Sequence, residues 1–157
     1  RVKYFGKADS NEVYDNIIHM NKFFRADFNF INFRDASKSP HAGKYSNSTI
    51  AFVTRTKVPP KRISRVDINF IDVFVTPEFF SGDHEYWDAY RAGALYHEMS
   101  HLRLCTADIV YGKGMCERLA RDKPAHAYRN ADNYGFYCEE AIARRYGIEK
   151  PTFDLKF

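Results

Sequence analysis

The chain has no long run of apolar residues, and this absence argues against a membrane-spanning protein. No stretch approaches the roughly 18 consecutive apolar residues of a membrane-spanning helix, so we expect no membrane span. No signal-peptide pattern is visible. Arg1 stands where a start Met would, which predicts a processed or excised chain that lacks any signal peptide or propeptide.

Cysteine is scarce, with three residues in 157, and the odd number leaves one without a partner in any internal pairing. A disulfide between Cys116 and Cys138 would suit a secreted enzyme and would leave Cys105 as a free thiol. The alternative is that all three are small apolar side chains in a reducing compartment.

Net charge is also small, at +4 with a predicted pI of about 8.9. The Lys and Arg residues are scattered, and the densest group, 57–65, is broken by Pro59 and Pro60. We therefore expect no nucleic-acid partner.

Aromatic residues are plentiful, with 14 Phe and 11 Tyr, which favours a compact core. The length predicts a single domain over 1–157, and we expect a monomer.

The most informative segment is His97-Glu98-Met99-Ser100-His101. Because a helix advances about 100° per residue, two histidines at i and i+4 lie on one face and can bind one zinc ion. The intervening Glu98 lies close enough to polarise a metal-bound water. The alternative is a pair of ordinary helix-surface histidines with a solvated glutamate, since short motifs also occur by chance.

Residues 83–104 have the pattern of a helix around this motif. Asp83 can cap its start, Glu85 suits the positive end of the helix dipole, and no proline interrupts the segment. A third ligand is needed, and both the thiol of Cys105 and the carboxylate of Asp108 are nearby donors. The side chains that recur at helical spacing are Trp87, Tyr90, Ala94, His97, Glu98, His101 and Leu102.

At these residues the chain resembles the aspzincin metalloendopeptidases, the family of deuterolysin and the peptidyl-Lys metalloendopeptidases. The family hallmark is H-E-x-x-H followed by G-T-x-D-x-x-Y-G, and here only the leading glycine is replaced, by Cys105. The resemblance covers about residues 66–146. Its further matches are Thr106, Asp108, Tyr111, Gly112, Asn130-Ala131-Asp132 and Pro77-Glu78-Phe79-Phe80.

The resemblance implies a role for each residue of the motif. His97, His101 and Asp108 would bind Zn²⁺, and the register of Asp108 with the family motif favours it over a cysteine as third ligand. Glu98 would be the general base, and Tyr111 would hydrogen-bond the oxyanion of the tetrahedral intermediate. Three protein ligands leave the fourth zinc position to water, whose pKa zinc lowers to about 7.

The resemblance also bears on the substrate. In the lysine-specific members the aspartate of N-A-D and a glutamate three residues later form an acidic pocket for lysine. Here Asp132 keeps the first carboxylate, but Gly135 replaces the second. We therefore expect Asp132 to bind substrate, with a preference for basic residues rather than strict lysine specificity. The alternative for Asp132 is a buried residue that orients the metal site by hydrogen bonding.

These expectations combine into an α+β, mainly helical, zincin-like metalloprotease fold with a small β-sheet. Its remaining elements are a helix opened by Asp9 or Ser10 and ending near 28–33, a loop over 35–48, a strand over 49–56, strand segments at 66–70 and 73–75, a helix over 115–121 and a final helix over 124–146 ended by Gly147.

The functional hypothesis is a secreted zinc endopeptidase that acts on protein or peptide substrates. A non-catalytic zinc-binding or interaction protein on the same fold is the alternative. Metal binding alone needs only His97, His101 and Asp108, whereas both Glu98 and Tyr111 are also present. Their presence favours the enzyme.

Overall fold

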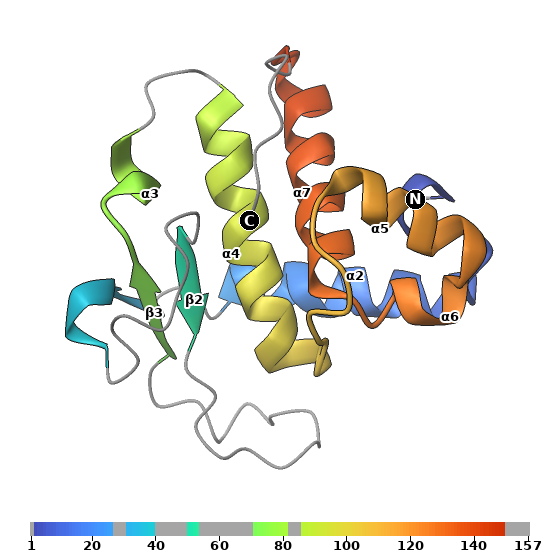
Figure 1. Cartoon of the computed structure of the whole chain (residues 1–157), viewed down its shortest axis with the longest axis horizontal. Helices are drawn as coiled ribbons and strands as arrows, with labels where there is room; N and C mark the ends of the chain where they lie inside the picture. The colour runs from blue at the N-terminus through green and yellow to red at the C-terminus, as the bar shows by residue number, and fades with distance from the viewer. Residues whose placement is uncertain (1, 27–30, 40–49, 54–70, 82–85, 150–157) are drawn as a thin grey trace.

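The computed structural model describes residues 2–26, 31–39, 50–53, 71–81 and 86–149 (Figure 1). The predicted strand at 66–70, the predicted cap at Asp83 and most of the apolar tail, 150–157, lie outside these ranges. Among the described helices, none is both long and apolar enough to cross a membrane.

A three-stranded sheet has the order β1 (Ile31–Asp35), β3 (Ile71–Val75), β2 (Ala51–Val53). β1 runs parallel to β3, while β2 pairs antiparallel with β3 and forms one edge. The predicted strands around 49–56 and 73–75 are confirmed. β1 was expected to be a helix end followed by a loop, and this prediction is wrong because its pairing partner lies far along the chain, which a local pattern does not reveal.

The first long helix, α2 (Ser10–Ala26), begins where the sequence predicts, and residues 27–30 after it lie outside the described ranges. The Asp9 carboxylate accepts hydrogen bonds from the backbone N–H groups of Asn11 (2.8 Å) and Glu12 (3.4 Å), which satisfies donors that the first helical turn leaves free. Val13 and Met20 on its apolar face are buried, as their spacing predicts.

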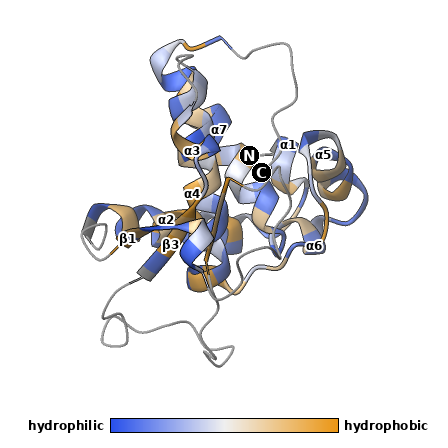
Figure 2. Ribbon diagram, turned by 60° about the vertical axis from the view of Figure 1, so that its left-hand side comes forward, coloured by the Kyte–Doolittle hydropathy of each residue, from blue (hydrophilic) through white to orange (hydrophobic). Residues whose placement is uncertain are grey.

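The metal-motif helix, α4 (Tyr86–Leu104), stands between the sheet and α7 (Ala131–Tyr146) (Figure 1). It is buried on more than one face, because α7, α2 and β2 all pack against it. Hydrophobic and hydrophilic stretches alternate along the helices, as expected for elements with one side on a core (Figure 2). The sheet and α7 therefore hold α4 from different directions.

The C-terminal region differs from the predicted single helix over 124–146. Two helices form instead, α6 (Pro124–Ala127) and α7, after α5 (Lys113–Asp122). Between them Asn130 is extended, with φ −96° and ψ 125°, and forms a parallel bridge with Ala107. The predicted end at Gly147 is confirmed, since this residue caps α7 with a left-handed φ of 66°.

Two four-residue helices, α1 (Val2–Phe5) and α3 (Glu78–Ser81), and a 3-10 turn at Ala36–Lys38 were not predicted. Elements this short carry too few residues to show a helical period. The pattern Pro77-Glu78-Phe79-Phe80 thus leads into α3 ahead of α4.

None of the three cysteines forms a disulfide with another described residue, so of the two possibilities that the sequence leaves open, the structure favours the one without a Cys116–Cys138 pair. The two thiols contact different elements. Cys116 is buried and its Sγ accepts from Nδ2 of Asn130 at 3.5 Å, while Sγ of Cys138 lies 3.9 Å from the carbonyl oxygen of Ala92 on α4. Cys105 is exposed at the end of α4.

Candidate metal centre

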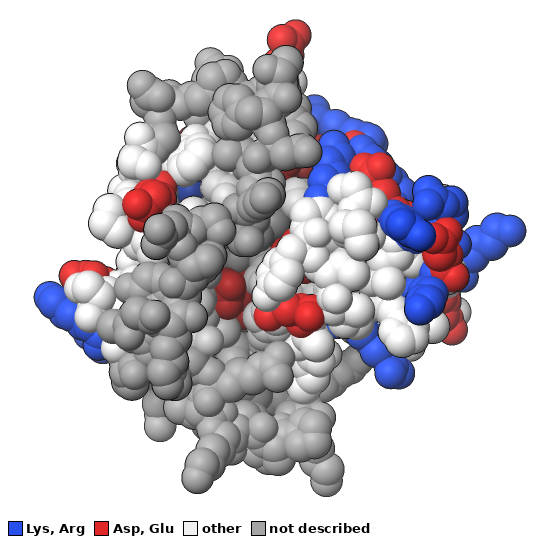
Figure 3. Space-filling view, in the orientation of Figure 1, with Lys and Arg blue, Asp and Glu red and all other residues white. Residues whose placement is uncertain are grey.

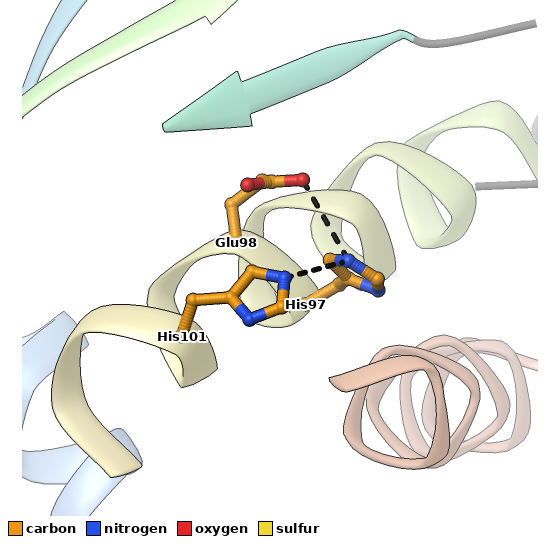
Figure 4. Close-up of side chains that lie close together, drawn as sticks. All are labelled: His97, Glu98 and His101. Atoms are coloured by element: carbon orange, nitrogen blue, oxygen red, sulfur yellow. Dashed lines mark hydrogen bonds and ion pairs between the residues drawn. The ribbon is translucent and has the colours of Figure 1, made fainter. Parts of the chain in front are cut away.

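Three donor atoms from α4 and the loop after it converge on one point. Nε2 of His97 lies 3.2 Å from Nε2 of His101. Oδ1 of Asp108 lies 3.2 Å from each of these nitrogens. The two imidazoles project from successive turns of α4, with the Glu98 carboxylate beside them (Figure 4). The structure thus brings together the three residues predicted as metal ligands.

A sharp chain reversal after α4 returns Asp108 to the two histidines. Cys105 has a left-handed φ of 56°, and the N–H of Thr106 reaches back to the carbonyl of Ser100 at 3.4 Å. A left-handed residue directly after the last turn is common at helix ends, and glycine is the usual residue there. The cysteine at this position therefore adopts a backbone conformation that suits glycine better.

The partners of the two Nδ1 atoms determine which nitrogen of each histidine ring carries the lone pair. Nδ1 of His97 lies 2.7 Å from Oδ1 of Asp132, and Nδ1 of His101 lies 3.0 Å from the backbone oxygen of Thr106. Both partners only accept hydrogen bonds, so each Nδ1 carries the proton when the ring is neutral. Each Nε2 then directs a lone pair toward the point shared with Asp108.

This donor set fits zinc. Donor atoms about 2.0–2.1 Å from a tetrahedral zinc ion lie roughly 3.3 Å from one another. The three observed separations are all 3.2 Å. Two lone pairs and a carboxylate oxygen repel each other at this distance unless a cation lies between them, and two histidines with one carboxylate are a usual catalytic zinc set.

The electrostatics of the site also favour positive charge. Burial would lower the pKa of His97, but the neighbouring carboxylates of Asp108 and Asp132 raise it to about 10. Burial would raise the pKa of Asp108, but its contacts with His101 and His97 hold it well below its usual range. A proton or a metal cation can supply the charge that these carboxylates stabilise.

Glu98 lies on the sheet side of the centre. It is 9% exposed, and its Oε2 accepts a hydrogen bond of 2.9 Å from the backbone N–H of Val53 on the edge strand β2. Its Oε1 lies 3.7 Å from Nε2 of His97 (Figure 4). Burial raises the pKa of Glu98. One carboxylate oxygen is therefore anchored to the sheet while the other faces the metal centre.

Tyr111 lies near the centre and is largely open to solvent. Its side chain is 56% exposed, and partial burial together with the Asp108 carboxylate raises the pKa of its hydroxyl. The hydroxyl therefore stays protonated at neutral pH and can donate a hydrogen bond. This is the property required of the oxyanion donor that the sequence predicts.

Asp132 does not have the exposure that substrate contact requires. It is completely buried, its Oδ1 contacts Nδ1 of His97, and its Oδ2 accepts a hydrogen bond of 2.8 Å from the N–H of Gly112. Both oxygens are thus used inside the protein. The burial favours the alternative, in which this carboxylate orients the metal site.

Among the described residues, the converging histidine and acidic side chains do not include Cys105. The geometry thus favours Asp108 over the thiol as third donor. Sequence reasoning assigned no role to Asn130 or Thr106, although both contact the site. Asn130 falls in the N-A-D segment, and this match was the available signal.

Acidic side chains lie near the middle of the face shown in Figure 3, whereas Lys and Arg side chains gather over the side that carries α5. Asp108 is partly accessible, with 37% of its side chain exposed.

The fold and the histidine–carboxylate centre together define a mainly helical α+β protein with a candidate metal centre. A family model described as lysine-specific metallo-endopeptidase, the aspzincins, matches residues 2–139. The chain belongs to this family, as its sequence motifs predict.

Individual relatives agree with the assignment. The chain is 41% identical over 56 residues to a peptidyl-Lys metalloendopeptidase of Armillaria mellea, a match that covers 34% of this chain and 16% of the relative. It is 39% identical over 51 residues to an extracellular protease of Aeromonas hydrophila, covering 31% and 15%, respectively. For a peptidyl-Lys metalloendopeptidase of Pleurotus ostreatus the identity is 43% over 51 residues, covering 31% and 30%.

A zinc peptidase from Grifola frondosa has a similar structure, with a TM-score of 0.58 and 24% identity, over 90% of this chain and 76% of the other. This likeness confirms the α+β fold. The matched regions span less than a third of each curated relative's own length.

Proposed function

We propose that the chain is the catalytic domain of a zinc-dependent endopeptidase. The observation that carries the proposal is the triangle of three donor atoms, each 3.2 Å from the other two, with a buried glutamate beside it. His97, His101 and Asp108 would hold the ion. When bound, zinc would lower the pKa of a water molecule and polarise the substrate carbonyl.

The protein side chains would then carry the proton transfers. Oε1 of Glu98 faces the centre and accepts a proton from the attacking water, after which the same carboxyl donates it to the leaving amine. Its raised pKa suits a group that must do both, because proton transfer is most effective when the pKa lies near the working pH. The N–H of Val53 keeps the carboxylate in place.

Tyr111 and Asp132 would have different roles. The protonated hydroxyl of Tyr111 donates a hydrogen bond to the oxyanion that develops on the substrate carbonyl. Asp132 orients His97 through its Nδ1–H, as outer carboxylates commonly do for zinc-binding histidines. This assignment replaces direct substrate binding by Asp132.

Substrates would be proteins or peptides with a preference for basic residues near the cleaved bond. Two relatives named peptidyl-Lys metalloendopeptidases support this preference. The name of the Aeromonas relative, an extracellular protease, supports secretion.

Metal content and casein hydrolysis of wild type, Glu98→Gln and Asp108→Ala test the proposal. Glu98→Gln should retain one zinc per chain and lose about 10²–10⁴-fold in turnover, since it removes only the proton acceptor. Asp108→Ala should bind zinc weakly. Cys105→Ser is the matched control and should keep both metal and activity.

Other outcomes have distinct meanings. Loss of zinc in Glu98→Gln would make Glu98 a ligand rather than a base. Loss of zinc in Cys105→Ser but not in Asp108→Ala would make the thiol the third ligand. Zinc binding by a wild-type chain that cleaves no peptide in a broad panel would refute the endopeptidase and favour a zinc-binding protein.

A further inference from the structure

The buried side chain of Asn130 contacts the loop that carries Asp108, although it touches none of the three metal-directed atoms. Its Oδ1 accepts hydrogen bonds from the N–H groups of Ile109 (2.8 Å) and Val110 (3.1 Å), and its Nδ2 donates to the carbonyl of Val110 at 3.1 Å. Asn130 is completely buried. One amide thus satisfies three backbone groups immediately after Asp108.

The backbone around Asn130 holds the loop on the other side of Asp108. The N–H of Ala107 donates to the carbonyl of Arg129 at 2.9 Å, and the N–H of Ala131 donates to the carbonyl of Ala107 at 3.0 Å. Asp108 is therefore bracketed, by this backbone bridge at the preceding residue and by the amide of Asn130 at the two following residues.

The amide itself has a fixed orientation. Nδ2 of Asn130 also donates to Oδ1 of Asn133 at 2.7 Å. Reversing the amide would place its NH₂ group against the N–H groups of Ile109 and Val110, so donors would face donors. Asn133 is anchored in turn, because its Nδ2 donates to the carbonyl oxygens of Tyr4 and Cys116.

We propose that Asn130 is a positioning residue for the metal centre, which holds the peptide on either side of Asp108 so that the carboxylate meets His97 and His101. The inference rests on the proposed zinc site. A ligand carboxylate on an irregular loop has conformational freedom that zinc binding would have to remove. Asn130 restricts that freedom in advance, and outer partners of this kind typically change metal affinity by about 10–100-fold.

Asn133 provides a matched control. Like Asn130 it is a fully buried asparagine at the start of α7, but its side-chain hydrogen bonds go to Tyr4, Cys116 and Asn130 rather than to the metal loop. Both Asn130→Ala and Asn133→Ala remove buried hydrogen bonds and should make the protein easier to unfold. Only Asn130→Ala removes contacts to residues 109 and 110.

The experiment measures the Zn²⁺ affinity of wild type and both variants by competition with a chromophoric chelator. Thermal unfolding is first followed by circular dichroism, and the affinities are measured at a temperature at which all three proteins are folded. Asn130→Ala should bind Zn²⁺ about 10–100-fold more weakly. Asn133→Ala should lose clearly less affinity, because it removes one hydrogen bond of the Asn130 amide and leaves those to residues 109 and 110 in place. The visible spectrum of the Co²⁺-loaded protein should change for Asn130→Ala only, because it reports ligand geometry.

Equal weakening in the two variants would overturn the positioning role, and so would wild-type affinity and spectrum in Asn130→Ala. If Asn130→Ala does not fold, the near-isosteric pair Asn130→Leu and Asn133→Leu, which keeps the bulk of each side chain and removes its polar atoms, gives the same comparison. Failure of the wild-type chain to bind Zn²⁺ would instead refute the proposed function, so the two failures are distinguishable.

Discussion

Replacing Gly112 by alanine should separate backbone strain from steric clash at the end of the metal loop. Gly112 has φ 84° and ψ 148°, a region that side chains other than hydrogen disfavour, and it caps the start of α5. A Cβ atom built at this position meets no heavy atom within 4 Å. Any cost of Gly112→Ala therefore arises from the backbone conformation and not from crowding.

Gly114, two residues later, provides the matched comparison. It lies inside α5, its φ is not positive, and its added Cβ also meets nothing within 4 Å. Alanine there should stabilise the protein by about 0.5–1 kcal/mol, because it loses less freedom than glycine when a helix forms. Alanine at Gly112 carries a conformational cost of about 1–3 kcal/mol. The reduced freedom of its unfolded chain offsets roughly 0.5–1 kcal/mol of this.

Urea unfolding of the two variants and wild type, each in excess chelator and again with zinc, measures the difference. The free energy of unfolding should fall by about 1–2 kcal/mol for Gly112→Ala and rise for Gly114→Ala. With zinc present the gap should widen, because the N–H of Gly112 donates to Asp132, which contacts His97. Equal stability of the two variants would show that the conformation of Gly112 is not strained and would refute the reasoning.

Cys105→Gly should raise the free energy of unfolding by about 0.5–1 kcal/mol in the same assay, since glycine removes the left-handed strain at φ 56°; Cys105→Ser, which keeps the Cβ, should not. Glu140→Gln tests acid stability. Burial would raise the pKa of Glu140, but hydrogen bonds from Tyr4, Lys3 and Arg144 lower it to about 2. Its contribution, about 1 kcal/mol after solvent screening, is present above about pH 4.5 and lost as pH falls toward 2. Wild type should exceed Glu140→Gln in stability at pH 7, with the difference vanishing at low pH; a constant difference contradicts the linkage.

The metal-motif helix and the closeness of His97, His101 and Asp108 could be predicted from the sequence because the relevant information is local. The spacing of His97 and His101 fixes their common face on any helix, and Asp108 follows within a short loop. The role of Asp132 was not decidable in the same way. Its full burial depends on how α7 packs against α4, and no pattern within α7 reports that packing.

The missed strand β1 has a similar cause. Its five residues pair in register with Ile71–Val75, and a parallel partner so distant leaves no turn signal beside either strand. The pairing of Cys116 and Cys138 could not be decided for a related reason, because spacing in the sequence does not give the distance between two thiols. Both cases concern contacts between elements rather than the elements themselves.

The break between α6 and α7 is the most informative of these errors. The helical pattern alone favours a continuous helix from Pro124 to Tyr146, yet the backbone of Asn130 is extended rather than helical. In return the extended backbone bridges Ala107, and the side chain of Asn130 reaches residues 109 and 110. A continuous helix would satisfy its backbone groups internally and could not form this bridge. Local preference is thus overridden at the point where the chain must hold the loop that carries Asp108, as expected where function constrains structure.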